Sequence, residues 1–134
     1  MIPMTLTLLI GIPIFVYWIA RRKQSRNVFL ATGIAFGAVA SPWSFGLYSW
    51  FFVSPLGAIL GFPGLILVAL HEFPGFHLSI YMGLVPKGQI VDGISQGLII
   101  ETINAIVWSI FYGFVGYLID TFRSRKKRGS GLAT

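Results

Sequence analysis

The sequence predicts an all-α integral membrane protein with a single membrane domain, and three observations support this prediction. Only 10% of the 134 residues are charged, 55% are hydrophobic, and the mean hydropathy is +0.79. A soluble domain carries about 25% charged residues, so this chain cannot cover a globular surface with polar groups, and lipid must cover it instead. The apolar residues also gather in long runs. The basic residues stand in two short groups, each directly after an apolar run.

Three of the apolar runs are long enough to cross a hydrocarbon core about 30 Å thick as helices. They occupy about residues 3–20, 28–49 and 97–120. A fourth apolar segment, 54–70, is shorter and is interrupted by prolines and glycines, so we expect it to be broken. Residues 71–96 are the least apolar internal part and are expected to form a surface loop, which can include an interfacial helix around residues 78–85. Residues 121–134 form a basic tail.

The two basic groups predict how the chain is threaded through the membrane. Their members are Arg21, Arg22, Lys23 and Arg26 in the first group, and Arg123, Arg125, Lys126, Lys127 and Arg128 in the second. Cytoplasmic loops are rich in Lys and Arg, so both groups are expected on the cytoplasmic side. The chain must then cross an even number of times between them. We therefore predict three transmembrane helices plus a re-entrant or interfacial segment at 54–70, with four transmembrane helices as the alternative.

Composition excludes several classes of function. The net charge of +6 sits beside apolar runs and not on a water-facing surface, so nucleic acid is not an expected partner. The chain has no cysteine, which excludes disulfides and thiolate chemistry. Charges follow the first apolar run instead of preceding it, so we expect an uncleaved anchor with its N-terminus outside. The basic tail is suited to anionic lipid headgroups, and bound lipid is the only expected cofactor-like molecule.

Small residues spaced four apart predict where helices pack closely, since they let two backbones approach in lipid. The packing residues are Gly33 and Gly37, Gly57 and Gly61, and Ala105, Ser109, Gly113 and Gly116. On the last span, one stripe is small and polar and is expected to face protein. This stripe runs through Glu101, Thr102, Ala105, Ser109, Tyr112, Gly113, Gly116 and Asp120, and leaves Asn104 to one side. The neighbouring helix can belong to this chain or to a partner.

Glu101 is the only carboxylate inside an apolar run, and Asn104 is the other polar residue of interest in that span. Glu101 could be a proton or cation site, a contact to an arginine of a partner, or a carboxylate that reaches headgroup water. His71, Glu72 and His77 are weak candidates for a metal site. Their spacing differs from the zincin H-E-x-x-H motif. Pro74 and Gly75 are also expected to break any helix between them, so no metal site is predicted.

No catalytic motif or phosphate-binding loop is present, and an enzyme is not expected. The stretch from Asn104 to Arg128, with Gly-Tyr-Leu-Ile-Asp before the basic tail, resembles the ends of many small bacterial membrane proteins. That resemblance implies no activity, and the predicted location is a prokaryotic cytoplasmic (inner) membrane. We predict an accessory or structural subunit of a larger membrane complex, bound to lipid and to other subunits or to a second copy. The alternatives are a small homo-oligomeric channel or transporter using Glu101, and, less favoured, a metalloenzyme.

Overall fold

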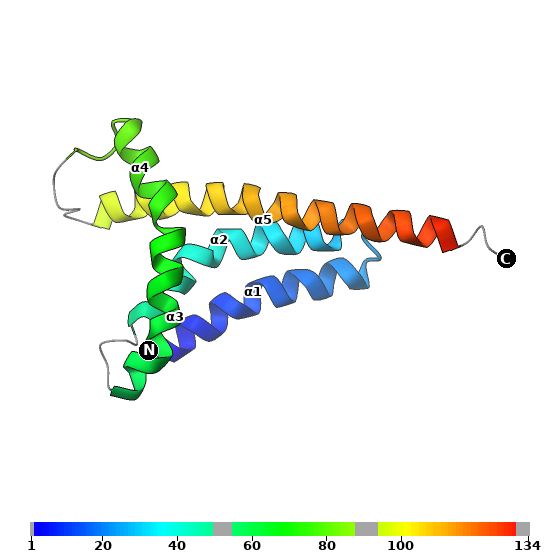
Figure 1. The fold of residues 1–134 in the computed structure, drawn as a ribbon, viewed down its shortest axis with the longest axis horizontal. Coiled ribbons are helices and arrows are strands. Elements are labelled where there is room, and N and C mark those ends of the chain that lie inside the picture. The colour runs from blue at the N-terminus through cyan, green and yellow to red at the C-terminus, as the bar shows by residue number, and fades with distance from the viewer. Residues whose placement is uncertain (1, 50–54, 88–93, 131–134) are drawn as a thin grey trace.

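The computed structural model describes residues 2–49, 55–87 and 94–130. This part of the chain contains helices and no strand, so the all-α prediction is confirmed for it. The helices are α1 (Ile2–Arg22), α2 (Val28–Ser49), α3 (Pro55–His71), α4 (Phe73–Tyr81) and α5 (Ile94–Ser130). Figure 1 shows α1, α2 and α5 running side by side, with α3 and α4 lying across one end of them. The predicted tail residues 131–134 lie outside the described part, as do the side chains of Lys126, Lys127 and Arg128.

Two helices in the described part are long and apolar enough to cross a membrane. The segments are Val28–Phe45, with a mean hydropathy of 1.5, and Gln96–Arg125, with a mean hydropathy of 1.7. A helix this apolar inside a soluble protein would be mostly buried, whereas only 22% and 17% of the residues in these two stretches are buried. Their exposed apolar side chains favour a membrane location for the chain.

Helix α2 lies in the middle of the layer, with α1 on one side and α5 on the other. The α2–α5 contact is close because glycines line it. A Cβ atom on Gly33 or Gly37 would overlap the backbone of α5 at Tyr112 and Trp108. A Cβ on Gly116 would overlap the backbone carbonyl of Phe29. We call Gly33, Gly37, Gly113 and Gly116 the glycine seam. At Gly33, Gly37 and Gly116 the two backbones touch directly, and at Gly113 the Ile34 side chain packs against the glycine. Small residues permit this close packing in lipid.

In three places the helix boundaries differ from the ranges expected from the sequence. Segment 54–70 was expected to be broken, but α3 is one continuous helix that keeps Pro63 inside it. The expected loop 71–96 contains α4, because Pro74 lies in the first turn, where a missing N–H leaves no intrahelical bond unmade. Helix α5 does not end near residue 120 but continues to Ser130, because nothing in the basic stretch stops a helix.

Candidate functional site

Eight side chains that form hydrogen bonds converge where α3 and α4 cross the ends of α2 and α5. We call them the polar cluster; they are Ser41, Ser44, His71, Glu72, Glu101, Asn104, Trp108 and Tyr112. Ser41, Ser44 and Asn104 are fully buried, and His71 is buried as well. Buried polar groups are costly unless they are hydrogen-bonded, so the partners of each one decide how the cluster works.

His71 is held on both ring nitrogens and on its backbone. Its Nδ1 lies 2.8 Å from Ser44 Oγ, and its Nε2 lies 3.0 Å from the Tyr112 hydroxyl. The Ser44 hydroxyl already donates to the Ala40 carbonyl, so Ser44 Oγ is left to accept from an Nδ1–H of His71. The Tyr112 hydroxyl then donates to Nε2, and Trp108 Nε1 donates to the His71 carbonyl at 2.8 Å. Burial lowers the pKa of His71, which agrees with a neutral ring in this tautomer.

Asn104 ties the first turn of α4 to α5. Its Oδ1 accepts a hydrogen bond from the Gly75 N–H at 2.7 Å. Its Nδ2 lies 3.5 Å from Ser41 Oγ, and the Ser41 hydroxyl donates to Glu72 Oε1 at 3.1 Å. A Cβ on Gly75 would overlap the Asn104 amide, so the close approach depends on the glycine. One amide thus joins three helices.

Glu72 and Glu101 bring two carboxyl groups into hydrogen-bonding contact. Burial raises the pKa of Glu72 to about 7, with the neighbouring Glu101 as the next cause, and no basic side chain in the described residues opposes it. Glu101 Oε2 is buried, and no N–H or O–H group of the described residues donates to it. Two ionised carboxylates in this position would repel each other, so the site favours a protonated form of Glu72 near neutral pH.

The weak metal candidates are not brought together. His71 and Glu72 belong to the polar cluster, whereas His77 is exposed on α4. The His77 Nδ1 lies 3.0 Å from the Phe73 carbonyl, and its ring centroid lies 4.0 Å from that of Phe73. Within residues 2–49, 55–87 and 94–130, no group of three His, Cys, Asp or Glu residues could hold a metal ion.

The buried face of α5 is wider than the predicted stripe. Asn104, placed off that stripe, is fully buried, while Thr102 is exposed and donates its hydroxyl to the Leu98 carbonyl of its own helix. The reason is that α5 contacts α2 along one side and α4 along another. Asn104 stood out in the sequence, and the signal that could have placed it on the buried face is that a lone amide inside an apolar helix requires a partner.

The other small residues occupy helix contacts within this chain. The Ser109 hydroxyl donates to the Ile34 carbonyl on α2 at 3.0 Å, and Ala105 is half-buried nearby. Gly57 and Gly61 are buried on α3. Gly64, which the spacing argument missed, faces the α2 backbone at Leu47 and Tyr48, where a Cβ would come within 2.5 Å of an atom. Gly64 follows Gly61 by three residues. Residues three apart lie on the same helix face, as residues four apart do, so a search for both spacings would have found it.

The two basic groups meet at the end of the layer opposite the polar cluster (Figure 1). The Arg22 guanidinium lies 5.1 Å from the ring centroid of Trp18, and Arg21 Nη1 donates to the Tyr17 hydroxyl at 3.1 Å. On the second group, the Arg123 guanidinium lies 5.0 Å from the ring centroid of Phe29. Arginine over an aromatic ring is a common arrangement where an apolar surface meets water.

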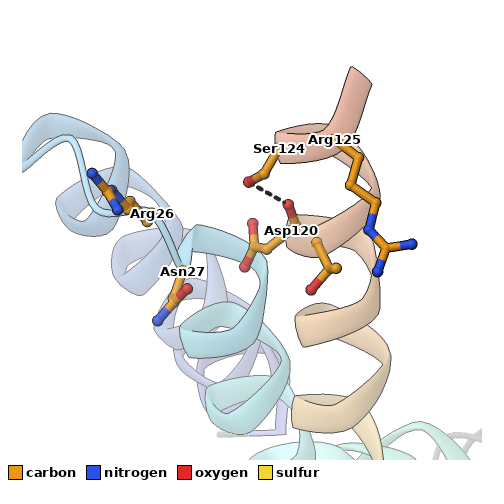
Figure 2. Close-up of a pocket in the computed structure, with 6 residues that line it drawn as sticks. Arg26, Asn27, Asp120, Ser124 and Arg125 are labelled. Carbon is orange, nitrogen blue, oxygen red and sulfur yellow. Dashed lines mark hydrogen bonds between the residues drawn. The ribbon is translucent and has the colours of Figure 1, made fainter. Parts of the chain in front are cut away.

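A pocket of about 290 Å³ opens at this basic end, between the start of α2 and the end of α5 (Figure 2). It is lined by Arg26, Asn27, Asp120, Thr121, Ser124 and Arg125. The Asp120 carboxylate points toward α2, and its Oδ2 accepts the Leu30 N–H at 2.9 Å. Asp120 therefore caps the start of α2, where unpaired N–H groups and the helix dipole favour a negative charge.

No protein family, curated protein or solved structure matches this chain.

Proposed function

We propose that this chain is an accessory or structural subunit of a larger membrane complex, with α1, α2 and α5 crossing the bilayer and α3 and α4 lying along its outer surface. The observation that carries the proposal is the open layer of helices. Helix α2 contacts both α1 and α5, but α1 and α5 lie on opposite sides of it. A layer one helix thick has almost no interior. Its buried apolar residues in the described part are Ala20, Val39, Ala40, Val85 and Ile100.

The arrangement of charges supports three crossings. The chain leaves the basic end along α2 and returns to it along α5. In the proposed orientation these two helices are the two crossings between Arg26 and Arg123. That number is even, as the positive-inside bias requires when both basic groups are cytoplasmic. The arm formed by α3 and α4 lies across the opposite end and does not run parallel to the other helices (Figure 1).

Cysteine accessibility tests this topology, because the chain has no cysteine of its own. We expect Ser25→Cys and Gly129→Cys to react with a membrane-impermeant maleimide only from the cytoplasmic side. Leu56→Cys on α3 and Tyr81→Cys on α4 are expected to react only from the other side. If Ser25→Cys and Gly129→Cys are labelled from opposite sides, the chain has four crossings.

The exposed apolar faces supply the surface for other subunits. On α5 the exposed side chains include Ile110, Phe114 and Phe122, and on α1 they include Ile14 and Phe15. Lipid alone can cover such faces, but a thin layer gains little stability by itself, and close packing against a second protein adds van der Waals contact that lipid does not match.

Site-specific photocrosslinking separates a protein neighbour from lipid. A photoreactive residue would replace Ile14, Ile66 or Phe114 in turn, so that α1, α3 and α5 are each sampled in the native membrane. We expect a discrete band above the monomer from at least one face, and no such band from a matched position that faces lipid. The proposal is wrong if none of the three positions gives a band and the purified chain is a stable monomer in mild detergent.

A small homo-oligomeric channel or transporter that uses Glu101 is the second candidate, and the contact between the Glu72 and Glu101 carboxyls favours it. Such a pair can hold and release a proton at the end of a path through the membrane. Flux of protons or monovalent cations into proteoliposomes should then fall at least tenfold in Glu101→Gln. Unchanged flux in that variant would remove Glu101 from any transport mechanism.

A further inference from the structure

We propose that Glu72 and Glu101 share one proton that latches the α3–α4 arm onto α2 and α5, so that loss of this proton releases the arm. The arm is defined as residues 55–81, the two helices that lie across the end of the layer (Figure 1). The latch concerns a change of shape within this chain. It therefore stands whether or not the chain joins a larger complex.

Glu72 occupies the joint of the arm, as the single residue between the end of α3 at His71 and the start of α4 at Phe73. Bonds on both sides of this joint attach the arm to the layer. Trp108 Nε1 donates to the His71 carbonyl before the joint, and the Gly75 N–H donates to Asn104 after it. Movement at Glu72 would therefore act on both helices of the arm.

No hydrogen bond can form between the two carboxyl groups unless one of them carries a proton. Ionised carboxylates are only acceptors, and the Ser41 hydroxyl reaches one oxygen of Glu72 alone. The buried Oε2 of Glu101 receives no hydrogen bond from the described residues. One proton turns two repelling acceptors into a donor and an acceptor, and so converts repulsion between the arm and α5 into a short hydrogen bond.

Each helix that packs around Glu72 contributes polar or titratable side chains. Helix α5 brings Glu101 and Tyr112, α3 brings His71, and α2 brings the hydroxyls of Ser41 and Ser44. On α4, His77 is exposed and lies against Phe73. Both ring nitrogens of His71 are bonded and burial lowers its pKa, so Glu72 is the group that can gain or lose a proton near neutral pH.

The pKa of Glu72 at about 7 supports this geometry, because it places the change within the physiological range. Glutamine at either position imitates the protonated carboxyl, since its amide N–H₂ donates a hydrogen bond and carries no charge. Glu72→Gln and Glu101→Gln should therefore lock the arm at all pH values.

Spin-label distances in the full chain test the latch. The pair Tyr81→Cys on α4 and Ile110→Cys on α5 would report the arm, since both side chains are exposed. The pair Ile14→Cys on α1 and Ile110→Cys would report the layer. In lipid nanodiscs, we expect the arm pair to give a narrow distance distribution at pH 5 that broadens and lengthens by pH 9, with a midpoint near pH 7. The layer pair should not change.

In Glu72→Gln and in Glu101→Gln, the arm pair should stay narrow from pH 5 to pH 9. The proposal is overturned if the wild-type arm distance is the same at both pH values, or if its transition persists in either glutamine variant. The layer pair shows whether each variant is folded. If a glutamine variant has lost the layer distance, Glu72→Asp serves as the second variant, and a transition midpoint unmoved from the wild type would also overturn the latch.

Discussion

The glycine seam and the polar cluster both join helices, but they do so by different physics. In the seam, Gly33 and Gly37 let the α2 backbone touch the α5 backbone, and no titratable side chain takes part. In the polar cluster, Asn104, His71 and Glu72 join helices through hydrogen bonds among side chains that are mostly buried. The seam therefore depends on the size of its residues, and the cluster depends on partners and protons.

This difference divides the molecule into a permanent part and an adjustable part. Van der Waals contact between backbones has no second state that a change of pH could favour. A hydrogen bond between two carboxyls exists only while a proton is present. We therefore expect the α2–α5 pair to act as a fixed frame and the α3–α4 arm to be the part that moves.

The largest expected effect comes from filling the seam. Gly37→Ala should lower the free energy of unfolding by about 3 kcal/mol, the upper end of the range for overpacking, because the overlapping atoms of Trp108 and Ser109 are backbone and cannot rotate away. Gly97→Ala on α5 is the matched control, since nothing lies within 4 Å of its added Cβ. Unfolding in mixed detergent micelles would measure both. Equal stabilities for the two variants would mean that the backbones do not touch at the seam.

A somewhat smaller effect is expected in the polar cluster. Asn104→Ala should cost about 2 kcal/mol, because the buried Gly75 N–H loses its acceptor. Thr102→Ala, two residues away, should change stability by less than about 0.5 kcal/mol, since its exposed hydroxyl bonds only its own helix. The same unfolding measurement applies. A loss at Thr102 as large as that at Asn104 would contradict the buried position of the amide.

Removing one hydroxyl tests the bonding assigned to His71. Tyr112→Phe keeps the aromatic ring that packs at 86° and 4.9 Å against Phe36, but removes the donor to His71 Nε2. We expect a loss of about 1 kcal/mol. Tyr117→Phe on the same helix is the control, because Tyr117 is half exposed. If the two variants lose the same stability, Tyr112 does not donate to the histidine.

The most gradual effect is a dependence of stability on pH. The pKa of Glu72 is raised from 4.5 to about 7 on folding, so the folded chain binds this proton more tightly than the unfolded chain. The contribution of this proton to the free energy of unfolding is complete below pH 4.5 and is lost as the pH rises through 7. The lowered pKa of His71 acts in the opposite sense, because the unfolded histidine takes up a proton below about pH 6.5.

The difference between the wild type and Glu72→Gln isolates the carboxyl. The free energy of unfolding of the wild type relative to this variant should fall between pH 4.5 and 7 and level off above that range. The seam variant Gly37→Ala should follow the wild-type pH dependence. A pH-independent difference between the wild type and Glu72→Gln would show that Glu72 titrates normally in the folded chain.

The sequence was a good guide to the helices and a poor guide to their ends. Long apolar runs and small-residue spacings predicted the elements that became α2 and α5, and the positions of Gly33 and Gly37 in their contact. The helix-breaking effect of proline was overestimated, since Pro63 lies inside α3 and Pro74 lies in the first turn of α4. In the first turn, the N–H that proline lacks would have no partner within the helix. The polar cluster was only partly predicted, since Glu101 and Asn104 stood out but their partners did not.

The sequence by itself determined that the chain is helical and too apolar for water to cover, and that its basic residues stand beside apolar runs. These properties are set by composition and by spacing along the chain, which no fold can change. Only the tertiary structure decided that Glu72 meets Glu101 and that His71 lies between Ser44 and Tyr112. The residues in these contacts lie up to 41 positions apart in the sequence. The contacts depend on α3 and α4 turning across the end of the layer, which brings residues from separate helices together.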